Sequence, residues 1–192
     1  MNSFQSHKKI ILKELREEID NGGVDTKVIP ILEAINSIPR YYTTSSCAGR
    51  ILLLELPKLG DKQNAVFLGR WHDKVSRNDI LSAVSNASHG SIWFLTQSPI
   101  FHIAAEDLDS SVKLLKIGYA AGFKHSGLKN IENRIIVELL STERIDVPIG
   151  RDGILLCNDK LLDFIVENAN YIIERSDDKL LRLQKEISTL KL

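Results

Sequence analysis

The order of the expected secondary-structure elements is the feature that most constrains this fold. Apolar residues at helical spacing cover Ser3–Asp20 and a second segment that ends at Ser37, and strand-like runs then follow with few helices between them. A doubly wound parallel sheet needs a regular alternation of strand and helix, which this chain lacks. The order therefore predicts an α+β fold with a mixed or antiparallel sheet and packed helices.

The strand-like runs are short and apolar, and polar turns separate them. They cover Tyr41–Cys47, Arg50–Leu56, 65–71, 91–96, Ile100–Ala105, 134–140 and 145–149. A turn is expected at 57–62 and a polar, glycine-containing loop at 122–130. A Ser/Gly turn before an apolar run that arginine opens occurs twice, at 45–56 and at 125–139. This similarity suggests an internal duplication as a hypothesis.

Helices are expected at both ends of the chain and between the strand-like runs. Asp25 or Thr26 is expected to cap the second helix, and Ser76 or Asn78 a short helix with Ile80, Val84 and Ala87 on its buried side. A helix over 107–121 is expected to bury Leu108, Val112, Leu115 and Tyr119. A stripe of Leu161, Ile165 and Ile172 begins the C-terminal helix, 158–191. Because its heptad-like repeat is short, this helix is expected to pack on its own sheet.

Composition excludes several classes of protein. The 25 basic residues balance 25 acidic ones, which argues against a nonspecific nucleic-acid coat but leaves room for a local basic patch. Cys47 and Cys157 form no Cys-x-x-Cys pair, so a disulfide scaffold or zinc knuckle is not expected and a reduced, cytoplasmic setting is. The polar segment 1–9 does not resemble a secretory signal, and no apolar run is long enough for a bilayer. A chain of 192 residues suits one soluble domain.

Polar side chains gather where the strand-like runs end. One such group of side chains is the run Ser45-Ser46-Cys47-Ala48-Gly49-Arg50. Polar groups are costly to bury without hydrogen bonds, so this run forms either a turn whose polar groups are all hydrogen-bonded or a binding site. The guanidinium of Arg50 suits a carboxylate or phosphate, and Gly49 permits a close approach. If the strand ends meet at one edge, other polar groups share a cleft with this run. They are Trp71-His72, Gln97-Ser98-Pro99 with His102, Gly122-Phe123-Lys124-His125-Ser126-Gly127 and Ser141-Thr142-Glu143-Arg144.

Several of these residues have two interpretations. His102, between two apolar residues, is either a satisfied core histidine or a proton acceptor. Trp71 with His72 either offers a stacking surface to a nucleobase or covers the core. Glu143 and Arg144 form either an internal ion pair or a ligand contact.

Other patterns are less specific. Lys113, Lys116, Lys124 and Lys129 form either a phosphate-facing strip or a solvated helix face. The histidine spacings match no metal motif, and no metal is expected. Cys47 is expected to be a small buried residue, because nothing near it resembles an activating base. Signatures of phosphate-binding loops, Rossmann sites and serine hydrolases are absent.

The ordered set of motifs closely resembles the tRNA wybutosine-synthesizing protein 3 family, in its short archaeal single-domain form. The motifs are Ser45-Ser46-Cys47-Ala48-Gly49-Arg50, Trp71-His72, Ser98-Pro99, the 122–127 loop and Ser141-Thr142-Glu143-Arg144. The resemblance covers about residues 1–190, and Ala48 and His125 are variants of the family's pattern. It implies a single methyltransferase domain over 1–192 that uses S-adenosylmethionine and lacks the usual methyltransferase fold. The implied target is the N4 nitrogen of the tricyclic wyosine-type base at position 37 of phenylalanine tRNA.

The reaction that the resemblance implies gives the site residues their expected roles. Because methyl transfer to nitrogen is an in-line displacement, positioning and desolvation should supply most of the acceleration. His102 or Glu143 is expected to accept the proton of the target nitrogen. The expected cofactor-binding residues are Ser45, Ser46, Gly49, Arg50, Ser126 and Gly127, and the expected substrate-binding residues are Trp71, His72, Phe123, Lys124 and Arg144. Two alternatives remain open: a noncatalytic RNA-binding module and a small-molecule-binding regulator.

Overall fold

The strands of this chain form two antiparallel sheets in two compact units, each with its own core. The computed structural model describes residues 3–61 and 63–191, so Lys62 of the predicted turn lies outside the described residues. Unit 1 takes the chain up to Ala48, Pro99–Thr142 and the chain from Ser176 on, and unit 2 takes Gly49–Ser98 and Glu143–Arg175. The predicted α+β class with antiparallel pairing is confirmed. The division into two sheets was not evident in the sequence, and the single domain over 1–192 stays a prediction.

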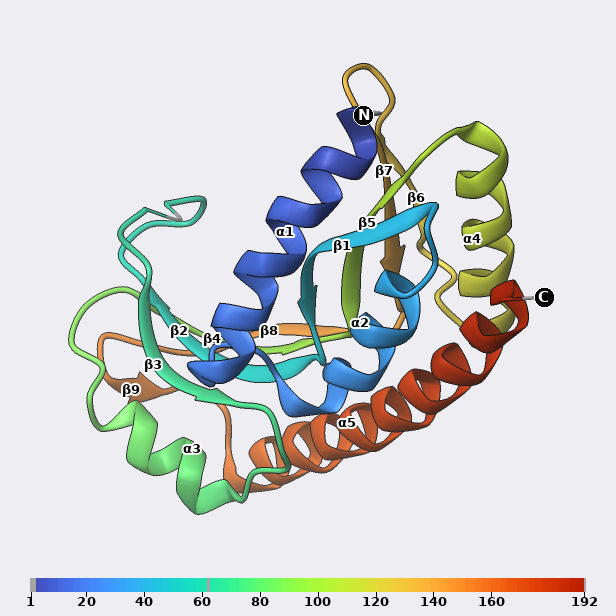
Figure 1. The fold of residues 1–192 in the computed structure, drawn as a ribbon. Helices are drawn as coiled ribbons and strands as arrows, with labels where there is room; N and C mark the ends of the chain where they lie inside the picture. Colours follow the sequence, from blue (N-terminus) through green and yellow to red (C-terminus); the bar gives the residue numbers. More distant parts are fainter. Residues whose placement is uncertain (1–2, 62, 192) are drawn as a thin grey trace. The chain divides into compact units, whose positions relative to one another are not determined.

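Unit 1 is built on a sheet of order β1-β5-β7-β6. Its strands are β1 (Tyr41–Cys47), β5 (Ile100–Ala105), β7 (Ile135–Leu140) and β6 (Gly127–Asn130). Its helical segments are α1 (Ser3–Asp20), η1 (Thr26–Val28), α2 (Ile29–Asn36), α4 (Leu108–Ala121), the later part of α5 (Asp159–Ser188) and η2 (Thr189–Lys191). Both α1 and α2 lie beside β1 (Figure 1).

The core of unit 1 lies on one face of its sheet. Phe101 and Ile103 of β5 join Val137 and Leu139 of β7 in packing against apolar residues of α2, α4 and α5. Because successive side chains of a strand point to opposite faces, His102 and Glu138 lie on the other face. The fold therefore places these two polar residues away from the packed core.

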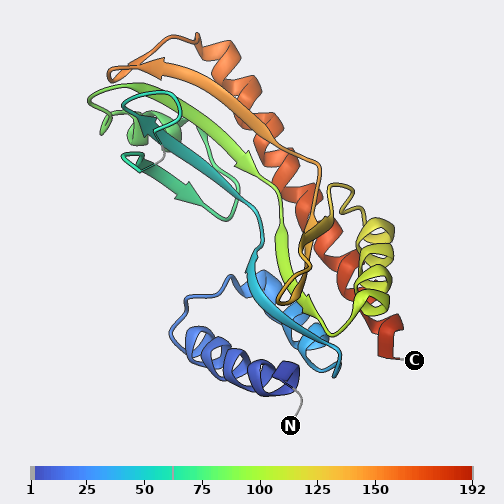
Figure 2. The ribbon, with the colours of Figure 1, turned by 90° about the horizontal axis from the view of Figure 1, so that it is seen from above.

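Unit 2 is built on a sheet of order β3-β2-β4-β8-β9. Its strands are β3 (Val66–Trp71), β2 (Arg50–Leu56), β4 (Ser91–Gln97), β8 (Ile145–Arg151) and β9 (Ile154–Leu155), and its helices are α3 (Arg77–Val84) and the first part of α5. Figure 2 shows β2, β4 and β8 side by side. Ile51, Phe94 and Ile149 pack from the sheet against α3 and α5.

Helix ends in the structure follow local sequence signals, with one exception. Ser76 caps α3 and forms a reciprocal capping box with Asp79, as one of the two predicted alternatives. Asp107 caps α4, and Gly122 ends it with a φ of 98° that favours glycine. The exception is the start of the second helix, where the Asp25 side chain caps nothing and instead accepts a hydrogen bond from the Ala48 amide at 2.8 Å.

The predicted buried face of α4 is wrong. Leu108, Val112 and Tyr119 are exposed, and the buried residues are Ser110, Ser111, Leu114, Ile117, Gly118 and Ala121. The two serines can be buried because their hydroxyls bond to Asp107 and to the Leu108 carbonyl. A β-carbon at Gly118 would come within 2.6 Å of Leu139, so this glycine permits the close contact. Small and satisfied polar residues, which a hydropathy pattern misses, define this face.

The other differences concern short strands and the last helix. Strand β6 falls inside the predicted 122–130 loop, and the two-residue strand β9 was not expected. As predicted, the terminal helix packs on the chain's own core, where Leu183 and Ile187 are fully buried. At its start, however, Leu162 is buried and Leu161 is exposed, contrary to the predicted stripe. Among the described residues no helix combines the length and apolarity that a membrane span requires.

Candidate functional site

The expected site residues are divided between the two units, and each set is described by itself. Unit 1 holds Ser45, Ser46, His102, Phe123, Lys124, Ser126 and Gly127, and unit 2 holds Gly49, Arg50, Trp71, His72, Glu143 and Arg144. The chain leaves unit 1 within the motif 45–50, after Ala48, and again within the motif 141–144, after Thr142. Two motifs that are continuous in the sequence therefore contribute to both units.

Three polar residues stand directly opposite one another on neighbouring strands of unit 1. Ser45 of β1 pairs with His102 of β5, which pairs with Glu138 of β7. The Ser45 Oγ lies 2.8 Å from His102 Nδ1, and His102 Nε2 lies 2.9 Å from Glu138 Oε2. Lys129 of β6 completes the set, with its Nζ 3.0 Å from Glu138 Oε1. We call these four residues the polar row.

Two irregularities in strand pairing shape the ends of the polar row. In β1, Thr43 pairs with Ile103 and Ser45 with His102, so Thr44 is an extra residue. In β6 the register shifts in the same way around Lys129. An extra residue in one strand re-aims the side chains that follow it. Without the shift in β1, Ser45 would point to the same face as Thr43, which is buried.

Glu138 is the charged centre of the polar row. Its side chain is 9% exposed, whereas that of His102 is 30% exposed. Burial by itself raises the pKa of Glu138, but hydrogen bonds and charge from Lys129 and His102 outweigh it and lower the pKa below the ordinary value. An ionised carboxylate therefore faces the histidine ring. Glu138 was not among the predicted site residues, although it is the single acidic residue in the apolar strand β7.

The structure argues against one of the two interpretations of His102, the core histidine. Its side chain is half-buried on the face opposite the core, and both ring nitrogens have polar partners. Phe101 and Ile103, its neighbours in β5, are the fully buried residues. His102 is therefore not a core histidine.

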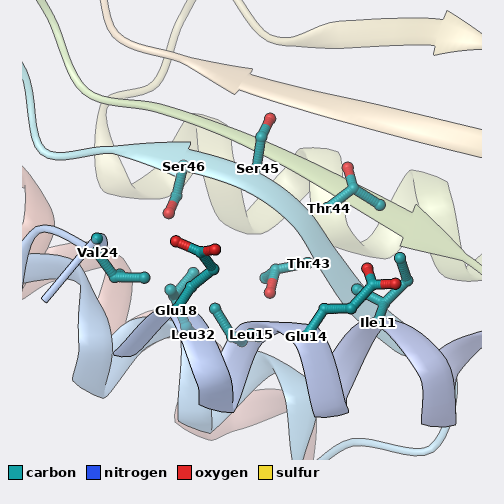
Figure 3. Close-up of a pocket in the computed structure, with 11 residues that line it drawn as sticks. Ile11, Glu14, Leu15, Glu18, Val24, Leu32, Thr43, Thr44, Ser45 and Ser46 are labelled. Atoms are coloured by element: carbon teal, nitrogen blue, oxygen red, sulfur yellow. The ribbon is translucent and has the colours of Figure 1, made fainter. Parts of the chain in front are cut away.

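A pocket of about 290 Å³ lies between α1 and β1, on unit 1. Glu14 and Glu18 of α1 line it together with Ile11, Leu15, Gly23, Val24, Leu32 and Thr43, Thr44, Ser45 and Ser46. Figure 3 shows the Ser46 hydroxyl pointing toward the Glu18 carboxylate, and the Ser45 hydroxyl pointing away from α1. The two serines that were expected to bind one cofactor thus point to opposite sides of β1.

In unit 2, Arg50 opens β2 opposite Gln97, the last residue of β4. Its Nε donates a hydrogen bond to Gln97 Oε1 at 3.0 Å, and among the described residues its two Nη groups have no hydrogen-bond or ion-pair partner. Gly49 precedes it with a φ of 93°, a backbone conformation that favours glycine. The His72 ring donates from Nδ1 to the Gly49 carbonyl at 3.3 Å. Arg50 is therefore oriented by one bond and keeps an open bidentate fork.

The remaining unit 2 residues have structural partners. Trp71 packs against the core, and a β-carbon at Gly69 would lie 1.9 Å from its ring. This contact fits the interpretation of Trp71 as a cover of the core, and its stacking role stays a prediction. The predicted ion pair of Glu143 with Arg144 is wrong. Glu143 pairs with Arg175 at 3.5 Å, and Arg144 pairs with Asp146.

The loop before β6 corrects one expected role and limits another. Phe123 is fully buried and packs edge-on against Phe101 at 6.0 Å between ring centres, so it cannot stack on a base. The Ser126 hydroxyl donates to the Phe123 carbonyl at 2.7 Å and accepts from the Leu140 amide at 3.1 Å. These bonds hold the loop, although one lone pair of the hydroxyl is left for a ligand. Lys124 is exposed, and Gly127 has open space where a side chain would begin.

The five lysines of unit 1 that concern the site have different surroundings. Lys113, Lys116 and Lys124 are exposed, as a phosphate-facing strip requires, whereas Lys129 belongs to the polar row. Lys179 of α5 was missed by the sequence analysis: it is 4% exposed and donates to the Ser141 hydroxyl at 2.8 Å and to the Thr142 hydroxyl at 3.3 Å. A buried ammonium thus holds the first half of the motif 141–144. No local pattern connects residues so distant in sequence.

Taken unit by unit, these residues define a class of protein. The fold is α+β, without the parallel sheet or glycine fingerprint of a Rossmann site. Unit 1 offers a histidine between a hydroxyl and a carboxylate, which suits proton transfer, and unit 2 offers an arginine fork, which suits a carboxylate or phosphate. A general base and an anion-binding group are compatible with a group-transfer enzyme.

Comparison with known proteins identifies the family. The family model described as "Methyltransferase TYW3" matches residues 6–189, and the chain belongs to this family. It is 42% identical over 190 residues to the tRNA(Phe) 7-((3-amino-3-carboxypropyl)-4-demethylwyosine(37)-N(4))-methyltransferase of Thermococcus sibiricus, covering 98% of this chain and 96% of that protein. It is 44% identical over 189 residues to the Pyrococcus horikoshii enzyme of that name, number 1, with the same coverage. The resemblance that the motifs indicated is confirmed.

Solved structures agree with this assignment. The structure of the PH1069 protein from Pyrococcus horikoshii superimposes with a TM-score of 0.92 at 44% identity and covers 96% of this chain and 95% of that one. A hypothetical protein from Aeropyrum pernix superimposes with a TM-score of 0.76 at 28% identity, covering 86% and 98%. The fold is therefore that of the family, and it is not the Rossmann methyltransferase fold.

Proposed function

We propose that this chain is a tRNA N-methyltransferase that transfers a methyl group from S-adenosylmethionine to N4 of the wyosine-type base at position 37 of phenylalanine tRNA. The observation that carries the proposal is the family match over 6–189, together with identities above 40% to enzymes whose names state this reaction. Those names specify a 4-demethylwyosine with a 3-amino-3-carboxypropyl group as the substrate of the relatives. We propose the same tRNA as the partner here, and the cytoplasm as the place of reaction.

The residues of unit 2 suit the amino-acid end of S-adenosylmethionine, which supplies the methyl group when it is bound. The open Nη fork of Arg50 matches a carboxylate in a bidentate pair. Gly49, beside it, has a φ of 93°, a backbone conformation that favours glycine. We assign the donor carboxylate to Arg50 because its Nε bond to Gln97 fixes the fork without using the Nη groups. The expected cofactor roles of Ser46, Ser126 and Gly127, in unit 1, stay predictions.

His102 is the better candidate for the proton acceptor. Glu143 pairs with Arg175, whereas His102 lies on an open face between a hydroxyl and a carboxylate. A histidine with a hydroxyl on one ring nitrogen and a carboxylate on the other has the geometry of a general base. For the tRNA we retain Trp71, His72, Lys124 and Arg144 as contacts, and Phe123 is withdrawn.

Methyl transfer to hypomodified tRNA tests the proposal. The purified protein is incubated with S-adenosylmethionine labelled in its methyl group and with tRNA from an archaeal strain that lacks the corresponding gene. We expect label in phenylalanine tRNA, in a nucleoside heavier by one methyl group. Fully modified tRNA from the parent strain is the control and should take up no label. Folded protein that binds this tRNA tightly but binds no S-adenosylmethionine in calorimetry would favour the RNA-binding module instead.

A further inference from the structure

We propose that Ser45, His102 and Glu138 form a proton relay in which the Ser45 hydroxyl is the group that meets the methyl acceptor. The inference rests on the proposed function and assigns new roles at the same site. Ser45 becomes a catalytic residue instead of a cofactor contact. Glu138 becomes a positioning residue that acts through His102.

The hydrogen-bond partners of His102 determine where its proton lies. Glu138 is ionised and can only accept, so His102 Nε2, 2.9 Å away, carries the hydrogen. In the neutral ring Nδ1 then has a lone pair, and the Ser45 hydroxyl at 2.8 Å donates to it. The hydroxyl oxygen keeps its own lone pairs for an incoming N–H group. Nucleophilic and acid–base sites commonly use this order of hydroxyl, imidazole and carboxylate.

Glu138 is held firmly enough to orient the ring. It lies on β7, between β5 and β6, and its side chain is 9% exposed. Its second oxygen accepts a hydrogen bond from Lys129 at 3.0 Å, so both oxygens have fixed partners. The Glu138 carboxylate lies next to the His102 ring, and its charge is opposite to that of an imidazolium. The groups that face His102 are thus a hydroxyl, a carboxylate and, behind the carboxylate, an ammonium.

The extra residue in β1, a β-bulge, leaves the serine of the relay exposed. Because Thr44 is an extra residue, Ser45 turns toward His102, and Ser45 itself is exposed. Figure 3 shows its hydroxyl on the side of β1 that faces away from α1 and its pocket. An acceptor that approaches this face reaches the serine oxygen before the more buried carboxylate. Bulges are over-represented next to active sites, where they re-aim a side chain.

The proposed step moves one proton from the acceptor nitrogen to His102. The acceptor nitrogen gives its proton to Ser45 Oγ while the hydroxyl proton of Ser45 passes to His102 Nδ1. The ring becomes an imidazolium that Glu138 stabilises. The nitrogen lone pair forms the bond to the methyl carbon of S-adenosylmethionine, and the electron pair of the broken carbon–sulfur bond stays on sulfur. Water later takes the proton from His102, and the relay returns to its starting state.

Nitrogen-15 NMR of the histidine side chains tests the relay without any turnover. We expect His102 in the wild-type protein to carry hydrogen on Nε2 and to accept at Nδ1. In Glu138→Gln this single tautomer should give way to a mixture, because a glutamine amide can donate as well as accept. A wild-type ring with hydrogen on Nδ1 would overturn the relay, whatever the protein's activity.

Single-turnover methyl transfer tests its role in the reaction. Ser45→Ala should lower the rate by about 10²-fold, the lower end of the range for general acid–base catalysis, while tRNA binding is unchanged. Ser45→Thr keeps the hydroxyl and should recover most of the rate. Thr44→Ala is the matched control, since it removes the neighbouring exposed hydroxyl, whose one bond to a described residue goes to the His102 backbone carbonyl, and it should change the rate less than about threefold.

The outcomes separate the relay from the proposed function. If the wild type methylates tRNA and Ser45→Ala is equally fast, the relay is wrong and the proposed function stands. If the folded wild type transfers no methyl group to any hypomodified tRNA, the proposed function fails and the relay's role in it fails too. A correct tautomer together with a slow Ser45→Ala and a fast Thr44→Ala supports both.

Discussion

The two sheets carry different groups at the middle of the face that points away from their own core. In unit 1 the central pair across β5 and β7 is His102 and Glu138. In unit 2 the central pair across β2 and β4 is Leu52 and Leu95. Arg70 of β3 and Asp146 of β8 stand on the outer sides of that pair, and Arg50 faces Gln97 at a strand end. In unit 1 the ionisable groups on neighbouring strands are thus bonded to one another, whereas in unit 2 two leucines separate Arg70 from Asp146.

This difference shows what each arrangement can do. Neighbouring strands of a sheet bring side chains within reach at fixed distances, so a row of polar residues forms a rigid chain of hydrogen bonds. Arg50 lies at the end of a strand, and its two Nη groups are available to donate hydrogen bonds to an external anion. We therefore assign proton transfer to unit 1 and anion binding to unit 2.

Separate cores are the first point to test. Phe101 lies in the core of unit 1 and Phe94 in that of unit 2, and both are fully buried. Replacing either phenylalanine by alanine should cost about 3–5 kcal/mol of unfolding free energy, because each leaves a cavity. Native-state hydrogen exchange should show the larger loss of protection in the sheet that carries the substitution. Equal losses in both sheets for both variants would contradict two separate cores.

Anion binding by unit 2 predicts a large effect of Arg50→Ala on donor affinity. A charged hydrogen bond contributes about 1.5–3 kcal/mol, so the Kd for S-adenosylmethionine should rise about 10- to 150-fold. Calorimetric titration measures it. Gln97→Ala, which frees the Nε but keeps the fork, is the matched variant and should have a smaller effect. Unchanged affinity in Arg50→Ala would remove this residue from the donor site.

The ionised Glu138 of the polar row predicts that the free energy of unfolding falls in acid. The folded-state pKa of Glu138 lies below its unfolded value, because hydrogen bonds and charge from Lys129 and His102 outweigh burial. Such a group stabilises the fold above the unfolded pKa of about 4.3, and this contribution is lost as pH falls through the lower folded value. Urea denaturation from neutral pH down to the acid range should show the loss. Glu138→Gln should have a flatter acid limb, and an equally steep limb would assign the acid sensitivity to other carboxylates.

The exposed lysines of α4 predict the smallest effect. If Lys113 and Lys116 face tRNA phosphates, replacing each by alanine should weaken tRNA binding modestly and lower the salt slope of log K by about one per contact. Filter binding at several salt concentrations measures this slope. Lys13→Ala, on α1 and paired with Glu17, is the control. If all variants have the same slope, the lysines form a solvated helix face.

Much of the fold could be predicted from the sequence because local signals determine it. The bounds of α1, β1, β2 and β5 follow from helical spacing and short apolar runs, and the Ser76 cap from residue chemistry. The face of α4 could not be predicted, because buried serines and Gly118 define it through partners elsewhere. The division into two sheets depends on which strands pair, and pairing is a property of the whole chain.

The candidate site was predictable in part for the same reason. Arg50 and His102 were identified because their residue types are unusual at a strand end and in an apolar strand. Glu138 and Lys129 were not connected to His102, since the contact requires the register of three strands. Phe123 seemed suited to stacking only because its loop is polar, and in the structure it turns into the core. Sequence indicates the kinds of groups, and the sheet determines which of them meet.

One comparison of two variants tests the division of labour most directly. Donor affinity and the single-turnover rate at saturating S-adenosylmethionine are measured for Ser45→Ala and Arg50→Ala, with circular dichroism to confirm that both fold. We expect Ser45→Ala to lower the single-turnover rate and to keep the donor affinity. We expect Arg50→Ala to lower the donor affinity and to keep most of the rate. The reverse pattern, or two variants that lose both properties equally, would contradict the division of labour.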